Sequence, residues 1–233
     1  MGAACGQPGM TAASATGNVE IYGMQISGNV IPCVTFAQDS KCGAFVLKDM
    51  MKGEMRTPEM LAVNPWGQMP SMKDGDFCLA ESNAILRYLA NCYNIQAYGG
   101  SDAQKRAMID WAMDWVSTNF MTNYFKYIWY PVAGFGSPAS DQAKVNQECN
   151  SSLDLFEKKF LPNKKFIGGE NMNIADYKLG CLLWYLSHPA VKAKSGYELP
   201  KRYKTYVDDY VTAMSPESQK FLDAGKAFLN SKQ

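Results

Sequence analysis

Two short stretches decide the fold: NPWGQMP at residues 64–70 and ESNAI at residues 81–85. Between them the sequence SMKDGDFCL, residues 71–79, predicts two strands joined by a tight turn, because Asp-Gly is a strong hairpin signal. Proline is tolerated at the start of a strand, and serine is favoured at the start of a helix. We therefore expect this segment to run strand, turn, strand and helix.

A functional interpretation uses Pro70 and Ser82 together. If the Met69-Pro70 peptide bond is cis, the backbone N–H and C=O of Met69 turn toward a ligand, and an incoming peptide pairs with them like an added strand. Ser82 supplies a hydroxyl and free backbone N–H groups at a helix N-terminus, which suits a carboxylate. Glu81 can receive a ligand ammonium. Together these residues describe a receptor for a small zwitterionic peptide; the structural alternative is a strand start and a helix cap.

Strands and helices alternate upstream of this segment. Residues 19–24 and 44–48 predict strands, and a helix begins near Asn29. A glycine-containing stretch over residues 94–101 breaks the pattern and predicts a linker. Downstream, helical spacing of apolar residues starts at Ser101 and recurs over residues 141–160, 173–186, 201–214 and 216–229. We expect an α/β domain followed by an all-α bundle.

The composition excludes several classes of function. Among 233 residues, 23 Lys and Arg balance 22 Asp and Glu, and the resulting net charge of +1 argues against a nucleic-acid-binding surface. No apolar stretch approaches the ~18 residues that a membrane-spanning helix needs. Seven cysteines without a C-x-x-C pair favour reduced thiols in the cytoplasm. The single histidine, His188, cannot form a multi-histidine zinc site, so we expect no metal and a histidine that caps a helix end.

The first 18 residues predict a flexible N-terminal tail. They carry no charge and are mostly small or polar, a composition that cannot build a core. The tail lacks the basic and apolar regions of a signal peptide. Gly2 and Cys5 are placed as in a dual lipid anchor, but Gly6 stands where such anchors usually have Ser or Thr. We expect membrane contact only if the N-terminus is acylated.

The motif set NPWGQMP, DGD and ESNAILRYLA resembles the glutathione-binding domain of cytosolic glutathione transferases. In the second half, RAMID (residues 106–110) resembles the start of that family's first C-terminal helix, and NIADY (residues 173–177) resembles its buried N-capping motif. The residues themselves predict this cap, because Asn173 can cap the helix while Asp176 bonds back to it. The resemblance implies a cytoplasmic homodimer. It also implies three parts: a thioredoxin-like domain at residues 19–94, a linker at 95–100, and an all-α domain with the electrophile site at 101–233.

The resemblance also assigns the glutathione contacts. It implies that Pro70 is a cis-proline and that the backbone of Met69 pairs with the cysteinyl part of glutathione. Arg56 falls where several classes of the family place a basic residue for the glycyl carboxylate. The γ-glutamyl end is expected to be held by Gln68, Glu81 and Ser82. Glutathione is then the co-substrate, and no metal is implied.

Two hydroxyls compete to activate the glutathione thiol. A free thiol with a pKa of ~8.5 is only about 3% ionised at pH 7, and the thiolate is the nucleophile. A hydrogen bond from a hydroxyl near a helix N-terminus lowers the thiol pKa. Ser27 precedes a predicted helix, as in classes resembling plant phi enzymes, whereas Tyr22 lies at the strand end, where alpha-, mu- and pi-like classes carry tyrosine. The sequence favours Ser27, because the Arg-Gly run that normally follows that tyrosine is missing.

The electrophile is expected to bind between the two domains, where small-molecule clefts commonly form. The resemblance points to Gln25 and Ile26 after the first strand, and to Phe120 and Tyr124 on the long helix; an aromatic core stripe is the structural alternative for the last two. The function it implies is conjugation of the glutathione thiolate to a hydrophobic electrophile, in detoxification. The alternatives are a glutathione-dependent peroxidase or isomerase of the same family, and a non-catalytic ligand carrier or scaffold.

Overall fold

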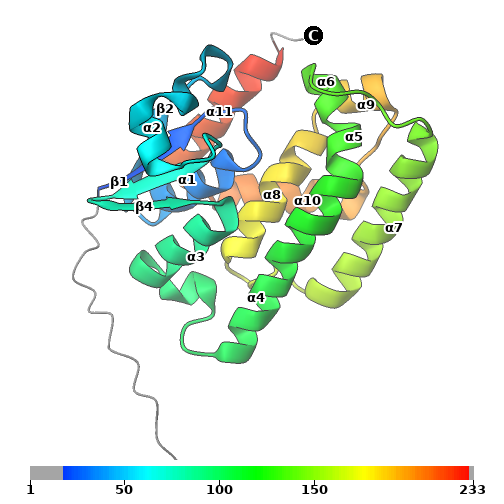
Figure 1. Ribbon diagram of the computed structural model, residues 1–233. Coiled ribbons are helices and arrows are strands. Elements are labelled where there is room, and N and C mark those ends of the chain that lie inside the picture. Colours follow the sequence, from blue (N-terminus) through cyan, green and yellow to red (C-terminus); the bar gives the residue numbers. More distant parts are fainter. Residues whose placement is uncertain (1–17, 231–233) are drawn as a thin grey trace, which may run out of the picture.

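The computed structural model of the protein describes residues 18–230. The expected tail, with Gly2 and Cys5, therefore lies outside the described residues except for Asn18. A four-stranded sheet with helices against it forms one half of the molecule, and helices alone form the other half (Figure 1). This architecture confirms the expected fold class of an α/β domain joined to a helical bundle.

The sheet has the strand order β2-β1-β3-β4. β1 (Val19–Gly23) and β2 (Gly43–Leu47) are parallel, and the connection between them contains α1 (Val30–Asp39). β3 (Ser71–Asp74) and β4 (Phe77–Ala80) form the predicted antiparallel hairpin around Gly75, whose positive φ of 61° suits glycine in a tight turn. A parallel crossover followed by an antiparallel hairpin is the thioredoxin-like arrangement that the resemblance implies.

Helices around the sheet are fixed by apolar burial and by local caps. α1 is buried along most of its length, and α3 (Ser82–Tyr93) buries Ile85, Leu86 and Leu89. α2 (Pro58–Val63) is a short helix that lies where the alternation of strands and helices before the hairpin predicts one; Thr57 caps it, because its hydroxyl accepts from the Met60 N–H. Two 3₁₀ turns precede it, η1 (Met50–Lys52) and η2 (Glu54–Arg56).

The stretch predicted as a linker is a compact turn. It contains the 3₁₀ helix η3 (Ile95–Tyr98), and Tyr98 is buried, with its hydroxyl donating to the Asp110 carboxylate at 2.9 Å. Gly99 and Gly100 follow with φ values of 80° and 62°, a conformation that glycine adopts without strain. The glycines therefore end a turn that packs against the helical half.

The helices of the second half lie close to their predicted positions. The predicted ones are α4 (Ala103–Trp115), α7 (Gln142–Phe160), α8 (Ile174–Leu186), α10 (Lys201–Ala213) and α11 (Pro216–Asn230). α5 (Lys126–Ile128) lies within the long helix predicted from Ser101, whereas two short helices were not predicted: α6 (Tyr130–Ala133) and α9 (Pro189–Ser195). His188 was expected to cap the end of the preceding helix, but it caps the start of the next one: its Nδ1 accepts from the Ala190 N–H at the start of α9, and Ser187 is the C-cap of α8.

The long helix predicted from Ser101 changes character halfway. After α4 it continues as η4 (Val116–Phe125), a π-helical segment. A π-helix closes hydrogen bonds over five residues rather than four, so side chains three and four apart no longer share one face. This difference changes which aromatic side chains reach the site.

α8 joins the two halves of the molecule. It is buried almost throughout and packs against α1, α4 and α10, while α11 returns to cover α1 (Figure 1). The predicted capping box is present at its start: the Asn173 side chain accepts from the Asp176 N–H, and the Asp176 carboxylate accepts from the Asn173 N–H. The next residue, Tyr177, donates its hydroxyl to Asp39 of α1 at 2.7 Å.

Candidate functional site

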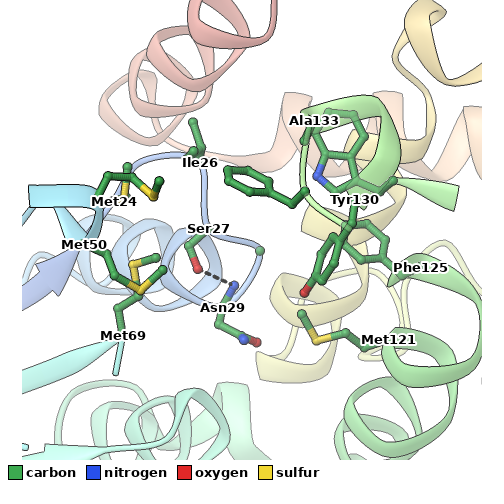
Figure 2. Close-up of a pocket in the computed structure, with 14 residues that line it drawn as sticks. Met24, Ile26, Ser27, Asn29, Met50, Met69, Met121, Phe125, Tyr130 and Ala133 are labelled. Carbon is green, nitrogen blue, oxygen red and sulfur yellow. Dashed lines mark hydrogen bonds between the residues drawn. The ribbon is translucent and has the colours of Figure 1, made fainter. Parts of the chain in front are cut away.

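A cavity of about 240 Å³ lies between the two halves of the molecule (Figure 2). One wall contains the loop between β1 and α1, Met69 and η1; the opposite wall is built from η4, α6 and neighbouring residues. The lining is mostly apolar and includes five methionines and four aromatic side chains: Met24, Met50, Met51, Met69, Met121, Phe125, Trp129, Tyr130 and Phe135. Methionine adapts to irregular shapes, so this lining suits an apolar small molecule.

Ser27 lies in the wall of this cavity. Its loop is held by the backbone: the Ser27 N–H donates to the Met24 carbonyl at 3.1 Å, and the Ser27 carbonyl accepts from the N–H groups of Val30 and Ile31, both at 3.0 Å. The Ser27 hydroxyl oxygen accepts from the Asn29 N–H at 3.3 Å (Figure 2). Within residues 18–230 no acceptor takes the hydroxyl proton, which is therefore available to a sulfur atom in the cavity.

Tyr22, the competing hydroxyl, is held away from the cavity. Its hydroxyl donates to the Glu20 carboxylate at 2.6 Å, and its ring packs in a small buried cluster with Met55 and Met60. Burial and the neighbouring Glu20 raise the pKa of Tyr22 well above its usual range, and the phenol proton is already donated to Glu20. Of the two candidate hydroxyls, only Ser27 lines the cavity.

A buried asparagine holds the segment at residues 64–70, which is predicted to bind glutathione, in its conformation. The Met69-Pro70 peptide bond is cis, and Met69 lines the cavity beside Gly23. The Gln68 carbonyl accepts from the Asn64 side-chain amide and from the Ser71 hydroxyl, both at 2.9 Å. Asn64 is 2% exposed and was not singled out from the sequence, although it opens the NPWGQMP motif. The Gln68 side chain is exposed.

Glu81 and Ser82 lie at the start of α3, as the motif predicts. Glu81 precedes the helix with φ of 69°, a left-handed conformation that is strained for a residue other than glycine and is often retained at functional sites. Its side chain is exposed, whereas Ser82 is buried and its hydroxyl accepts from Lys178 of α8 at 2.6 Å. Arg56 is exposed at the end of η2 and does not line the cavity.

Only some of the residues expected to hold the electrophile line the cavity. Ile26 lines the cavity, but Gln25 does not. Phe120 is fully buried and stacks on Trp115, and Tyr124 packs beside it. The aromatic core stripe is therefore the better description of Phe120 and Tyr124.

The physical reason for this difference is the π-helical geometry of η4, which turns Met121 and Phe125 toward the cavity instead. The methionines were missed because they are spread over distant segments, although 14 in a chain of this length are a usable signal.

Tyr130 supplies a second hydroxyl. It starts α6, and its hydroxyl group points into the space between the two walls (Figure 2). Burial raises the pKa of Tyr130, so the phenol stays protonated at neutral pH and remains a hydrogen-bond donor. Tyr130 was not selected from the sequence, although Pro131, which follows it directly, is a signal for the helix break between α5 and α6.

No group of three or more His, Cys, Asp or Glu side chains among residues 18–230 is arranged to hold a metal ion. The six cysteines that the structure describes are free thiols. In the same residues, every helix is either too short or too polar to cross a bilayer.

Known proteins resemble this chain over both halves. The family model for the glutathione S-transferase N-terminal domain matches residues 44–91, and that for the C-terminal domain matches residues 112–207; together they cover more than half of the chain. Human glutathione S-transferase theta-1 is 37% identical over 134 residues, which are 55% of this chain and 56% of the human protein. The chain thus matches little more than half the length of that relative.

Two further comparisons cover more of the chain. Glutathione S-transferase F10 of Arabidopsis thaliana is 27% identical over 179 residues, 74% of this chain and 83% of that protein. The apo structure of human glutathione-S-transferase T1-1 superposes with a TM-score of 0.74 at 27% identity, covering 92% of this chain and 90% of that one. The two family models, the fold and the placement of the cavity agree, and the chain belongs to the glutathione S-transferase family.

Proposed function

We propose that this protein is a glutathione transferase that joins the glutathione thiolate to a hydrophobic electrophile. One observation carries the proposal: the Ser27 hydroxyl, with its proton free, lies in the wall of an apolar cavity beside Met69. A thiol placed there has a hydrogen-bond donor on one side and space for an apolar acceptor on the other. Glutathione binding and transferase activity in the named relatives support the same assignment.

The mechanism we propose combines thiolate stabilisation with proximity. Met69 pairs its backbone with the cysteinyl part of glutathione, while Gln68, Glu81 and Ser82 hold the γ-glutamyl end. The glycyl carboxylate is assigned to Arg56, which reaches it as an exposed, flexible side chain. The Ser27 hydroxyl donates a hydrogen bond to the sulfur and lowers the thiol pKa, and the thiol proton is released to solvent. The thiolate then attacks a carbon of the bound acceptor, so that a C–S bond forms and a leaving group such as halide departs.

The cavity lining indicates the class of acceptor. No Asp, Glu, Lys or Arg is among the residues that line it, so a neutral apolar electrophile binds without burying an unpaired charge. Ile26, Met121 and Phe125 form the apolar contacts, and Tyr130 adds one donor. We infer that aryl and alkyl halides and unsaturated carbonyl compounds fit this cavity better than charged acceptors.

Replacing Tyr130 with phenylalanine tests the role of the second hydroxyl. We expect kcat for an α,β-unsaturated ketone to fall about tenfold, because the hydroxyl donates to the oxygen on which charge develops, a loss of about 1.4 kcal/mol. An alkyl halide, whose charge leaves with the halide, serves as the matched acceptor and is expected to react at an unchanged rate. Equal losses for both acceptors would contradict this role for Tyr130.

Homodimer formation and a cytoplasmic role in detoxification belong to the same proposal. The first half of the molecule exposes Trp66 and Phe77, and the helical half exposes Met108 and Trp111. Large apolar side chains of this kind are typical of protein–protein contacts. Sedimentation of the purified protein tests the dimer directly, and a monomer at micromolar concentration would contradict it.

Two measurements separate the proposal from its alternatives. The ultraviolet absorbance of the bound thiolate, followed against pH, reports whether the protein lowers the glutathione thiol pKa. Turnover with an aryl halide and with an organic hydroperoxide then distinguishes conjugation from peroxidase activity. A lowered pKa with conjugation supports the proposal. A lowered pKa with peroxide turnover alone favours the peroxidase, and glutathione binding without a pKa change favours a carrier.

A further inference from the structure

A lysine lies buried behind the proposed glutathione site. Lys178 belongs to α8 and is 1% exposed, yet it is directed at two residues of the other half of the molecule. Its Nζ donates to the Ser82 hydroxyl oxygen and to the Asn29 side-chain carbonyl, each at 2.6 Å. These are two of the shortest hydrogen bonds between the halves, and both end at a helix N-terminus: Ser82 begins α3, and Asn29 precedes α1.

The charge of Lys178 has no counter-ion in the structure. Within residues 18–230 its ammonium forms no ion pair, and both of its partners are neutral oxygens. The N-termini of α1 and α3 add further positive potential at the same place, because helix dipoles point their positive ends there. A buried, unpaired cation is costly. Its position is explained if an anion from outside the protein completes the site.

We propose that Lys178 is a positioning residue for the α-carboxylate of the γ-glutamyl group of glutathione, and that it acts through Ser82. The inference rests on the proposed function, since it names how one contact of that site is made. Lys178 supplies the buried positive charge that favours a carboxylate. It also fixes the orientation of the Ser82 hydroxyl, which meets the ligand.

The hydrogen-bond inventory of Ser82 explains the orientation. A serine hydroxyl has one proton and two lone pairs. Because Lys178 donates to the oxygen, one lone pair is occupied and the proton of Ser82 must point elsewhere. The Ser82 proton is at present donated to the side-chain carbonyl of Asn29 at 3.4 Å, a long contact that a carboxylate readily replaces.

The same lysine is also linked, through Asn29, to the loop that carries Ser27. Asn29 accepts from Lys178 through its side chain, and its backbone N–H donates to the Ser27 hydroxyl. Lys178 thus connects Ser82, which is assigned to the γ-glutamyl end, with the loop that carries Ser27. A carboxylate that settles at Ser82 is therefore connected to the loop of Ser27 by two consecutive side-chain contacts.

Groups on α1, on α8 and directly before α3 act on this ammonium. Burial lowers the pKa of Lys178, whereas Cys33 of α1, Cys181 of α8 and Glu81 before α3 oppose that shift. Of these, only Glu81 carries a charge at neutral pH, because burial raises the pKa of Cys33 to about 12 and raises that of Cys181 further. A ligand carboxylate would add the anion that favours the charged form of Lys178.

The test compares glutathione with an analogue that lacks the α-carboxylate, 4-aminobutanoyl-cysteinylglycine. Binding of each is measured by titration calorimetry to wild type, to Lys178→Met and to Lys178→Gln. We expect glutathione to bind at least tenfold more weakly to both variants, while the analogue binds wild type and variants within twofold of one another. Lys220→Met removes an exposed lysine of α11 and is expected to change neither affinity.

A second arm asks whether Lys178 acts through Ser82. In a Ser82→Ala background, Lys178→Met is expected to weaken glutathione less than threefold, because the intermediary hydroxyl is gone. The melting temperature of the unliganded Lys178→Met protein is expected to stay level or rise, since replacing a buried charge with an apolar side chain often stabilises.

Each other outcome is decisive. Equal weakening of glutathione and the analogue, or loss of folding in both Lys178 variants, would show a structural lysine and overturn the inference. Wild type that does not bind glutathione would instead overturn the proposed function.

Discussion

Replacing Ser27 with alanine is expected to raise the pKa of the glutathione thiol in the complex by about 2 units, to nearly its free value of ~8.5. The reason is the loss of the one hydroxyl that lines the cavity beside Met69 and has its proton available. A shift of 2 pKa units corresponds to about 2.7 kcal/mol of preferential thiolate stabilisation. At pH 6.5 the thiolate fraction falls from about one half to about one hundredth, so kcat/KM for an aryl halide is expected to fall about 50-fold.

The measurement is a pH titration of the thiolate absorbance in complexes of wild type and variants. Tyr22→Phe is the matched control: it also removes one hydroxyl, from β1, but a hydroxyl that donates to Glu20, on a side chain that packs in a separate cluster. We expect it to leave the thiol pKa within 0.3 of wild type, ~0.4 kcal/mol. If Tyr22→Phe raises the pKa and Ser27→Ala does not, the serine assignment is wrong.

The choice between the Ser27 and Tyr22 hydroxyls shows how much of the site can be predicted from the sequence. Alternate residues of a strand point to the same face, so Glu20 and Tyr22 share one side of β1. The alternation of β1 therefore places Tyr22 beside Glu20, where the structure forms their hydrogen bond. The residue types alone leave Tyr22 as an alternative to Ser27, because the resemblance covers classes of the family that use tyrosine and classes that use serine.

Local signals predicted the fold well because they act over few residues. The hairpin at Gly75 and the cap at Asn173 each depend on residues within four positions of one another. The lining of the cavity depends instead on geometry that no short window contains. The π-helical segment η4 moves Met121 toward the cavity and Phe120 away from it.

Lys178 is the clearest case of a residue whose contacts cannot be predicted from the sequence. It stands in an apolar helix of which nearly every residue is buried, where a lysine has no local explanation. Its two partners, Asn29 and Ser82, are 149 and 96 residues away along the chain. Only the packing of α8 against α1 and α3 brings the three side chains together.

Replacing Asp176 with alanine is expected to have the largest effect on stability. The carboxylate is fully buried and accepts four hydrogen bonds: from the N–H groups of Ile167 (2.7 Å), Gly168 (3.1 Å) and Asn173 (2.8 Å), and from the Tyr206 hydroxyl (2.6 Å). Alanine leaves these donors buried without an acceptor, at about 1–3 kcal/mol for each group that water cannot reach. We expect the free energy of unfolding to fall by about 4–5 kcal/mol, measured by urea denaturation.

The loss is expected to depend on pH with a definite sign. Burial raises the pKa of Asp176 to about 6, and its hydrogen bonds oppose that rise. A carboxyl whose folded-state pKa exceeds its unfolded value of ~3.9 contributes stability below pH ~4, and that contribution is lost as pH rises through about 6. The difference between wild type and Asp176→Ala is therefore expected to be larger at pH 5 than at pH 8, by roughly 1 kcal/mol.

The matched control is Asp208→Ala on α10, which removes an exposed carboxylate from a helix that packs against α8. It is expected to change the free energy of unfolding by less than about 0.5 kcal/mol. If Asp176→Ala were as mild as this control, the buried carboxylate would not be what anchors α8 to the loop of Ile167 and Gly168. Because α8 also carries Lys178 to the glutathione site, such a result would separate the stability of this helix from the geometry of that site.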